Sequence, residues 1–175
     1  MNIKIEKEYK MLLSKKQIDK IIENDDELKL EVFENYYYDL NSPNSVMRIR
    51  NFEDLYILCL KTRDGEDLIE KECLVSDLND PNIAKLLMYY GFKPAKLLGS
   101  TICSRYTKKI KNGQLCLDYT TYPNKEKDYE IEFELDDHQD NDISEFIAYL
   151  KKYNIEYEEN KISKFKRFLE RRTNG

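Results

Sequence analysis

Charged and apolar residues alternate along several short segments of this chain, and this alternation restricts its possible folds more than any other feature. In a β-strand, residues two positions apart lie on the same face. In residues 2–12, Glu6, Glu8 and Lys10 therefore share one face, while Ile3, Ile5, Tyr9 and Met11 share the other. Such a segment separates two environments, one polar and one apolar.

The same pattern returns in later segments, and there the charges on one face often have the same sign. These like-charged sets are Arg48 and Arg50, then Glu70 and Glu72, and then Glu130, Glu132 and Glu134. For any single strand, a half-buried sheet whose charged face meets water explains the alternation. A solvent-exposed sheet normally intersperses both signs, however, so the recurrence favours a more confined location for these charges.

The periodicity predicts one α+β domain over residues 1–175, a length sufficient for a sizeable core. The expected strands are residues 2–12, 32–40, 45–52, 55–63, 67–75, 96–110, 114–122 and 128–135. Helices are expected after Ser14, from Pro81, around Phe146 and over residues 161–172. Helices with apolar stripes need an apolar surface to pack on, and the apolar strand faces provide it. We therefore predict a closed, eight-stranded antiparallel β-barrel, a tunnel with an inward charged face and helices packed on the outside.

Composition and charge disfavour several classes of protein. The net charge of −5 argues against a general nucleic-acid-binding domain, which normally carries a basic excess. No apolar run approaches the roughly 18 residues of a membrane span, and the first residues lack the apolar segment of a signal peptide. We therefore expect a cytoplasmic protein that binds neither membranes nor nucleic acids. The four cysteines have no CxxC spacing and are interpreted as free thiols, and the single histidine, His138, is not expected to be catalytic.

Inward-facing charges must be paired or must hold a ligand. Clustered carboxylates suit hard divalent cations such as Mg²⁺ or Mn²⁺. Paired arginines suit phosphate oxygens, which a guanidinium group can bind in a bidentate manner. Carboxylates for metal combined with cations for phosphate indicate metal-assisted phosphoryl transfer.

The run Glu6-Lys-Glu8-Tyr-Lys10 has the ExExK signature that opens the CYTH domains, also called triphosphate tunnel metalloenzymes. The resemblance continues through Tyr37-Tyr38-Asp39, Arg48-Ile-Arg50, Lys61, Glu70-Lys-Glu72, Arg105, Asp118 and the run from Tyr129 to Glu134. A lone ExExK is weak, because any charged strand can produce it, but the ordered set over residues 3 to about 168 is specific. The chain looks most similar to the bacterial branch from low-GC Gram-positive organisms.

This resemblance implies roles for individual residues. The implied ligands of one or two divalent ions, Mg²⁺ or Mn²⁺, are Glu6, Glu8, Asp118, Glu130 and Glu132. The implied cations for the triphosphate are Lys10, Arg48, Arg50, Lys61 and Arg105, joined by Lys161 or Lys164 from the C-terminal helix. The residues expected to take part in catalysis are Glu6, Glu8, Lys10, Glu130 and Glu132, and the supporting acidic wall is Glu70, Glu72 and Glu134.

The function implied by the resemblance is hydrolysis of a triphosphate-bearing small molecule. We expect an inorganic triphosphatase that converts tripolyphosphate to pyrophosphate and phosphate, with thiamine triphosphate or a nucleoside triphosphate as variant substrates. The alternatives are a class IV-type adenylyl cyclase, which needs an adenine site, and a non-catalytic polyphosphate-binding module. The sequence leaves open whether the chain is a monomer or a homodimer.

Overall fold

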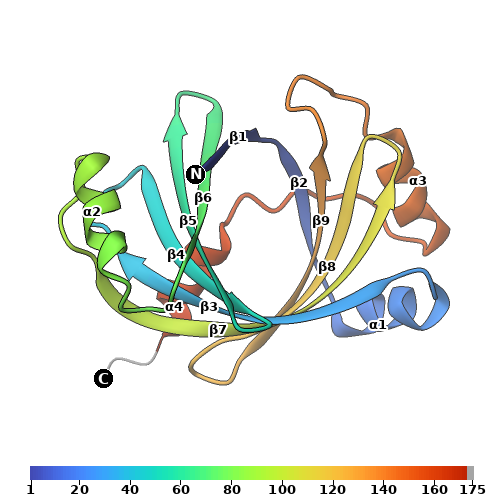
Figure 1. The fold of residues 1–175 in the computed structure, drawn as a ribbon. Helices are drawn as coiled ribbons and strands as arrows, with labels where there is room; N and C mark the ends of the chain where they lie inside the picture. The colour runs from blue at the N-terminus through green and yellow to red at the C-terminus, as the bar shows by residue number, and fades with distance from the viewer. Residues whose placement is uncertain (173–175) are drawn as a thin grey trace.

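The computed structural model describes residues 1–172, which form a strongly curled antiparallel sheet accompanied by helices (Figure 1). The strands are β1 (Asn2–Glu6), β2 (Glu8–Leu13), β3 (Lys29–Asp39), β4 (Ser45–Phe52), β5 (Leu55–Asp64), β6 (Asp67–Val75), β7 (Lys96–Ile110), β8 (Gly113–Thr121) and β9 (Lys127–Leu135). The helices of the described residues are α1 (Lys15–Asn24), α2 (Pro81–Tyr89), α3 (Ser144–Lys152) and α4 (Lys164–Arg171). The predicted α+β class and the antiparallel sheet are confirmed.

The sheet has nine strands, in the order β1-β6-β5-β4-β3-β7-β8-β9-β2, where eight were predicted. The difference arises at Lys7, which divides the expected first strand into β1 and β2. β1 pairs with β6, whereas β2 pairs with β9. The first and last strands of the sheet order are therefore consecutive in the chain and joined by a single residue.

The apolar strand faces pack under three helices on the convex side of the sheet, as predicted. α1 and α3 cover β2, β8 and β9, and Ile18, Phe146 and Phe133 are fully buried between them. α2 covers the outer face of β4 and β5, where Met47 and Ile49 are fully buried. Because the odd-numbered residues of β4 face this core, its arginines must face the other side of the sheet.

The capping residues predicted to start α1 and α2 form the expected local structure. The Ser14 hydroxyl accepts a hydrogen bond from the Gln17 amide at 3.1 Å, and the Gln17 side chain accepts one from the Ser14 amide at 2.9 Å. This capping box satisfies amides that have no partner inside the helix. At α2, the Asp80 carboxylate accepts from the Asn82 amide at 2.8 Å and Pro81 occupies the first turn.

The fourth helix departs from the prediction that helices pack on the outside. The ring of Phe168 stacks on Tyr37, with 4.7 Å between ring centroids, and Phe168 is fully buried. Tyr37 lies on the inner face of β3 and borders the central cavity together with Lys164 and Phe165 of α4. α4 therefore packs on the concave side, because its aromatic residues meet an apolar position of the inner face.

Membrane-spanning helices and cysteines are the two features of composition that the structure describes directly. In the described part of the chain, no helix has both the length and the apolar content needed to span a lipid bilayer. All four cysteines are free, and Cys59, Cys103 and Cys116 are buried while Cys73 is half-buried.

The start of β8 leaves no room for a larger residue. A Cβ atom added at Gly113 would lie 2.3 Å from the Glu134 carbonyl oxygen and 2.6 Å from the Phe133 ring. We expect Gly113→Ala to lower the free energy of unfolding by about 1–3 kcal/mol, because backbone and a buried ring must shift. Urea unfolding measures this, with exposed Gln114→Ala as a control expected within about 0.5 kcal/mol of wild type. Equal stability of the two variants would contradict this packing.

Candidate functional site

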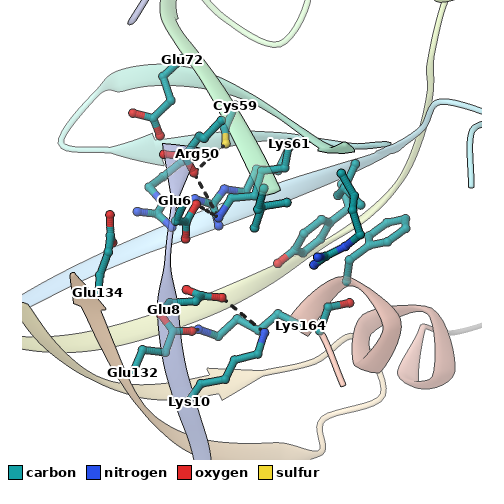
Figure 2. Close-up of a pocket in the computed structure, with 18 of the residues that line it drawn as sticks. Glu6, Glu8, Lys10, Arg50, Cys59, Lys61, Glu72, Glu132, Glu134 and Lys164 are labelled. Carbon is teal, nitrogen blue, oxygen red and sulfur yellow. Dashed lines mark hydrogen bonds and ion pairs between the residues drawn. The ribbon is translucent and has the colours of Figure 1, made fainter. Parts of the chain in front are cut away.

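The concave face of the sheet encloses a cavity of about 440 Å³ that is lined mainly by charged side chains (Figure 2). These charged residues come from seven strands and from α4: Lys4, Glu6, Glu8, Lys10, Arg48, Arg50, Lys61, Arg63, Glu70, Glu72, Arg105, Glu132, Glu134 and Lys164. Both signs of charge therefore converge on one cavity from elements that are distant in sequence.

The break at Lys7 does not disturb the alternation that points side chains into the cavity. Lys4 and Glu6 of β1 and Glu8 and Lys10 of β2 all line it. Sequence reasoning missed Lys4, although its position two residues before Glu6 carries the same signal. Lys4 forms ion pairs with Glu70 at 3.1 Å and with Glu134 at 2.7 Å.

Arg48 and Arg50 give the cavity cations without carboxylate partners. Within residues 1–172, neither guanidinium group forms an ion pair, and the Nε atom of Arg48 is buried without a hydrogen-bond partner. Arg50 donates from Nε to the Asn35 side-chain oxygen at 3.0 Å and lies 3.8 Å above the Phe33 ring. Burial and the positive charges of Arg48 and Arg105 lower the pKa of Arg50 to about 9. This part of the cavity therefore has an excess of positive charge that an anion would compensate.

Glu6 of β1 brings a buried carboxyl group to the same cavity. Its carboxylate is buried and accepts a hydrogen bond from Lys61 at 2.7 Å. Burial raises the pKa of Glu6 to about 8 with help from the charges of Glu8 and Glu70, even though Lys61 acts in the opposite direction. A buried carboxyl group beside other carboxylates is the kind of oxygen donor set that a hard divalent cation stabilises.

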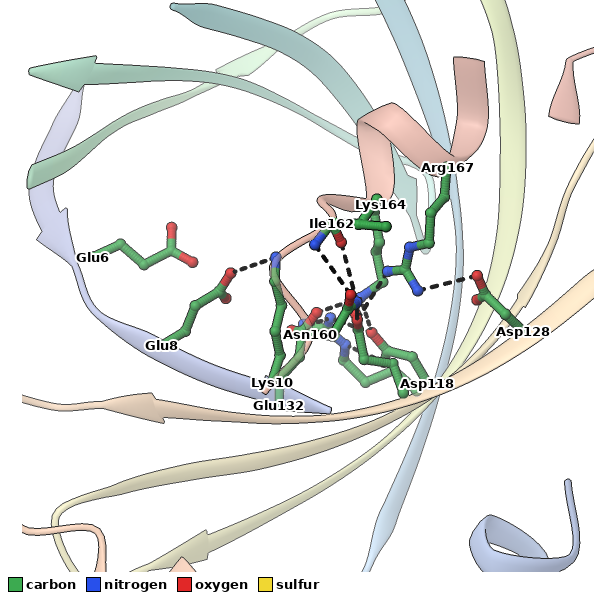
Figure 3. Close-up of polar contacts among 12 residues, drawn as sticks. Glu6, Glu8, Lys10, Asp118, Asp128, Glu132, Asn160, Ile162, Lys164 and Arg167 are labelled. Atoms are coloured by element: carbon green, nitrogen blue, oxygen red, sulfur yellow. Dashed lines mark hydrogen bonds and ion pairs between the residues drawn. The ribbon is translucent and has the colours of Figure 1, made fainter. Parts of the chain in front are cut away.

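A second carboxylate cluster lies deeper, beside α4, and consists of Asp118, Glu130 and Glu132 (Figure 3). One oxygen of each carboxylate lies within 4.8 Å of the other two. Burial and the Glu132 charge raise the pKa of Glu130 to about 7. Burial would likewise raise the pKa of Asp118, but the attraction of Arg105 and Lys164 outweighs it, so this pKa is lowered.

The structure thus separates the five predicted metal ligands into two groups. Glu6 and Glu8 lie apart from the deeper cluster in Figure 3, and Glu8 is in contact with Lys10 at 3.4 Å. Asp118 and Glu130 are completely buried and do not line the cavity, whereas Glu132 does. Alternation alone could not reveal this division, because it fixes which face a side chain occupies but not its depth.

The C-terminal helix contributes Lys164, and not Lys161, to the cavity. Lys161 is exposed. Sequence reasoning missed Arg167, which is buried and donates to Glu130 at 2.9 Å and to Asp128 at 3.1 Å. Its spacing of three residues from Lys164 places both cations on one side of α4, and this spacing was the available signal.

Cys59 lies beside the acidic wall formed by Glu70 and Glu72. Its sulfur donates a hydrogen bond to a Glu70 oxygen at 3.4 Å. Burial raises the pKa of the Cys59 thiol to about 11, so the thiol is protonated at neutral pH. His138 does not line the cavity.

Comparison with known proteins identifies this arrangement. The family model described as CYTH domain matches residues 4–169. A Bacillus subtilis (strain 168) protein named "Putative triphosphatase YjbK" is 30% identical over 190 residues, and the match covers 97% of each chain.

Solved structures share the fold. A Bacillus halodurans "putative adenylate cyclase" has a TM-score of 0.74 at 25% identity, with 96% of this chain and 99% of that chain covered. The "putative adenylyl cyclase HpAC1" from Hippeastrum, described as having a dominant triphosphatase activity, has a TM-score of 0.69 at 21% identity. Its match covers 99% of this chain and 97% of that chain.

The raised pKa of Glu6 predicts how stability depends on pH in the absence of metal. Between pH 5 and 8 the folded protein retains a proton on Glu6 that the unfolded chain, with its ordinary pKa of 4.5, has released. The free energy of unfolding should therefore fall as pH rises through this window. In Glu6→Gln this contribution is lost, so the fall should be smaller by at least about 1 kcal/mol.

Urea unfolding in EDTA at pH 5 and pH 8 measures this difference. The matched control is Glu23→Gln, which removes an exposed carboxylate of α1 and should follow wild type. Identical pH dependence in wild type and Glu6→Gln would show that Glu6 titrates like an ordinary carboxyl group.

Proposed function

The chain belongs to the CYTH domain family, and from this premise we propose that it is a divalent-metal-dependent triphosphatase that hydrolyses phosphoanhydride bonds in its central cavity. The observation that carries this proposal is that one cavity holds two arginines without an ion pair among the described residues together with several carboxylates, of which Glu6 and Glu70 are buried. Such a cavity complements a compact polyanion that carries metal ions.

In this proposal, the chain's own cations bind and orient the substrate. Arg48 and Arg50 grip the phosphate chain, since neither is engaged by a carboxylate among the described residues. Bidentate guanidinium contacts suit non-bridging phosphate oxygens and stabilise the charge that develops on them. Lys10, Lys61 and Arg105 border the same space and neutralise the remaining charge.

Glu6 and Glu8 are the proposed metal-holding residues at the cavity wall, and Mg²⁺ or Mn²⁺ suits their oxygen atoms. A bound divalent ion supplies positive charge that polarises the phosphoryl group. Glu132 and Glu134 on β9 face the same cavity and extend the acidic wall with Glu70 and Glu72. β1, which carries Glu6, pairs with β6, and β2, which carries Glu8, pairs with β9. The backbone that positions both carboxylates is therefore held in the sheet.

Inorganic triphosphate is the preferred substrate in this proposal, and the products are pyrophosphate and phosphate. The name of the Bacillus subtilis relative supports a triphosphatase, and the mainly charged lining supports a ligand that is mostly phosphate. The second candidate is an adenylyl cyclase, which the description of the Bacillus halodurans structure favours. A non-catalytic polyphosphate-binding module is the third.

Three further parts of the proposal concern organisation. We propose that the nine strands act as one closed tunnel, since the two end strands of the sheet order are joined at Lys7. We propose a single domain over residues 1–175, of which 173–175 lie outside the described residues. We also propose a cytoplasmic location, with a small-molecule triphosphate as the partner and a monomer or homodimer as the state.

A substrate panel tests the proposed reaction. Purified protein with Mg²⁺ or Mn²⁺ is given tripolyphosphate, thiamine triphosphate or ATP, and phosphate, pyrophosphate and cyclic AMP are quantified. We expect phosphate and pyrophosphate from tripolyphosphate, and no product in EDTA. Cyclic AMP from ATP would support the cyclase instead, and tight binding without any product would support the binding module.

Substitution of the proposed metal ligand tests the role of the acidic wall. Glu6→Gln should lower turnover of tripolyphosphate by at least about 100-fold, because it removes a charged ligand of the ion that would stabilise the reacting phosphoryl group. Glu23→Gln on the outer surface of α1 should retain wild-type turnover. Near-normal hydrolysis by Glu6→Gln would refute the assignment of Glu6 to the metal.

A further inference from the structure

The ammonium group of Lys164 occupies the centre of the deeper carboxylate cluster (Figure 3). Its Nζ atom contacts Asp118, lies 2.5 Å from Glu132 and lies 3.3 Å from Glu130. Only 15% of the Lys164 side chain is exposed. One cation thus bridges all three carboxylates, which is the position that a divalent ion bound to this cluster would take.

Fixed cations already balance the charge of this cluster. Arg105 donates to both oxygens of Asp118 at 2.7 Å and reaches Glu132 at 3.2 Å. Arg167 donates to Glu130 at 2.9 Å. Three carboxylates therefore face Lys164 and two arginines, and an added divalent ion would create a surplus of positive charge.

One oxygen atom of the cluster nevertheless lacks a hydrogen-bond donor among the described residues. The Oε1 atom of Glu130 is completely buried and has no hydrogen-bond partner among the described residues. The Lys164 ammonium lies 3.3 Å from this oxygen and forms an ion pair with it. A buried carboxylate oxygen without a donor is costly, and a closer cation would relieve that cost.

The backbone around Lys164 is anchored, so the side chain is the part that can move. The Asn160 amide donates to the Lys10 carbonyl oxygen at 2.7 Å, and the Asn160 side chain donates to Glu130 at 3.0 Å. On the other side, Phe168 is buried against Tyr37. Lys164 has a flexible four-carbon stem and borders the cavity, so its ammonium can leave the cluster without undocking α4.

We propose that Lys164 acts as a built-in competitor for metal at the cluster of Asp118, Glu130 and Glu132. While its ammonium is in place, this cluster does not bind a divalent ion, and an ion that enters must displace it. Glu6 and Glu8 lie outside this cluster and are the metal-holding residues of the proposed function. This inference rests on the proposed function only in assuming that divalent ions enter the cavity.

Counting bound Mn²⁺ tests the proposal directly. Isothermal titration calorimetry and electron paramagnetic resonance, both without any phosphate compound, give the number of Mn²⁺ ions per chain. Lys164→Met should bind one more Mn²⁺ per chain than wild type, or bind at the cluster at least about tenfold more tightly, because a competing charge is removed. Lys164→Arg keeps the charge and should behave as wild type, and so should Lys161→Met, which changes an exposed lysine three residues away. Equal Mn²⁺ stoichiometry and affinity in Lys164→Met and wild type would overturn the proposal.

Thermal unfolding of the same variants covers the case in which Lys164→Met folds poorly. Loss of the ammonium leaves the carboxylates undercompensated, so the variant should unfold at a lower temperature than wild type in EDTA and gain more stability from Mn²⁺. If Mn²⁺ stabilises Lys164→Met no more than it stabilises wild type, the competition is refuted. No triphosphate is present in these measurements. A negative result here therefore does not bear on the proposed triphosphatase activity, and a negative result in the substrate panel does not bear on the competition at this cluster.

Discussion

Ionised side chains on the inner face of this sheet can stay buried because opposite charges reach them, both from adjacent strands and from strands that are not their neighbours. Glu6 of β1 meets Lys61 of β5, with β6 between them, and Glu132 of β9 meets Arg105 of β7, with β8 between them. Such pairs form only when the sheet curls enough for side chains to meet over the intervening strand. The curvature of the sheet and the charge of the cavity therefore depend on each other.

The sequence predicted most strands and the side each charge occupies, because alternation with period two directly reports the two environments of a strand. β4 is the clearest example. Its apolar residues Met47 and Ile49 are fully buried under α2, while Arg48 and Arg50 line the cavity. Turn and helix-cap signals also involve only residues that are close in the sequence, so they can be predicted. Ser14 and Gln17 formed the expected capping box.

Features that depend on three-dimensional distances could not be predicted in this way. The division at Lys7 follows from which strands β1 and β2 pair with, and the single-sequence pattern runs through it unbroken. The position of α4 on the concave face follows from Phe168 stacking on Tyr37, two residues far apart in sequence. That contact also selects Lys164 over Lys161 and places Arg167 against Glu130.

The central claim is that one internal cavity holds a metal-bearing polyphosphate between its arginines and its carboxylates. A crystal structure of the protein with Mn²⁺ and a non-hydrolysable triphosphate analogue, with anomalous diffraction to locate manganese, tests it most directly. We expect manganese beside Glu6 and Glu8 and phosphate oxygens in contact with Arg48 and Arg50. Manganese and phosphate bound only on the outer surface, with these four side chains unliganded, would contradict it.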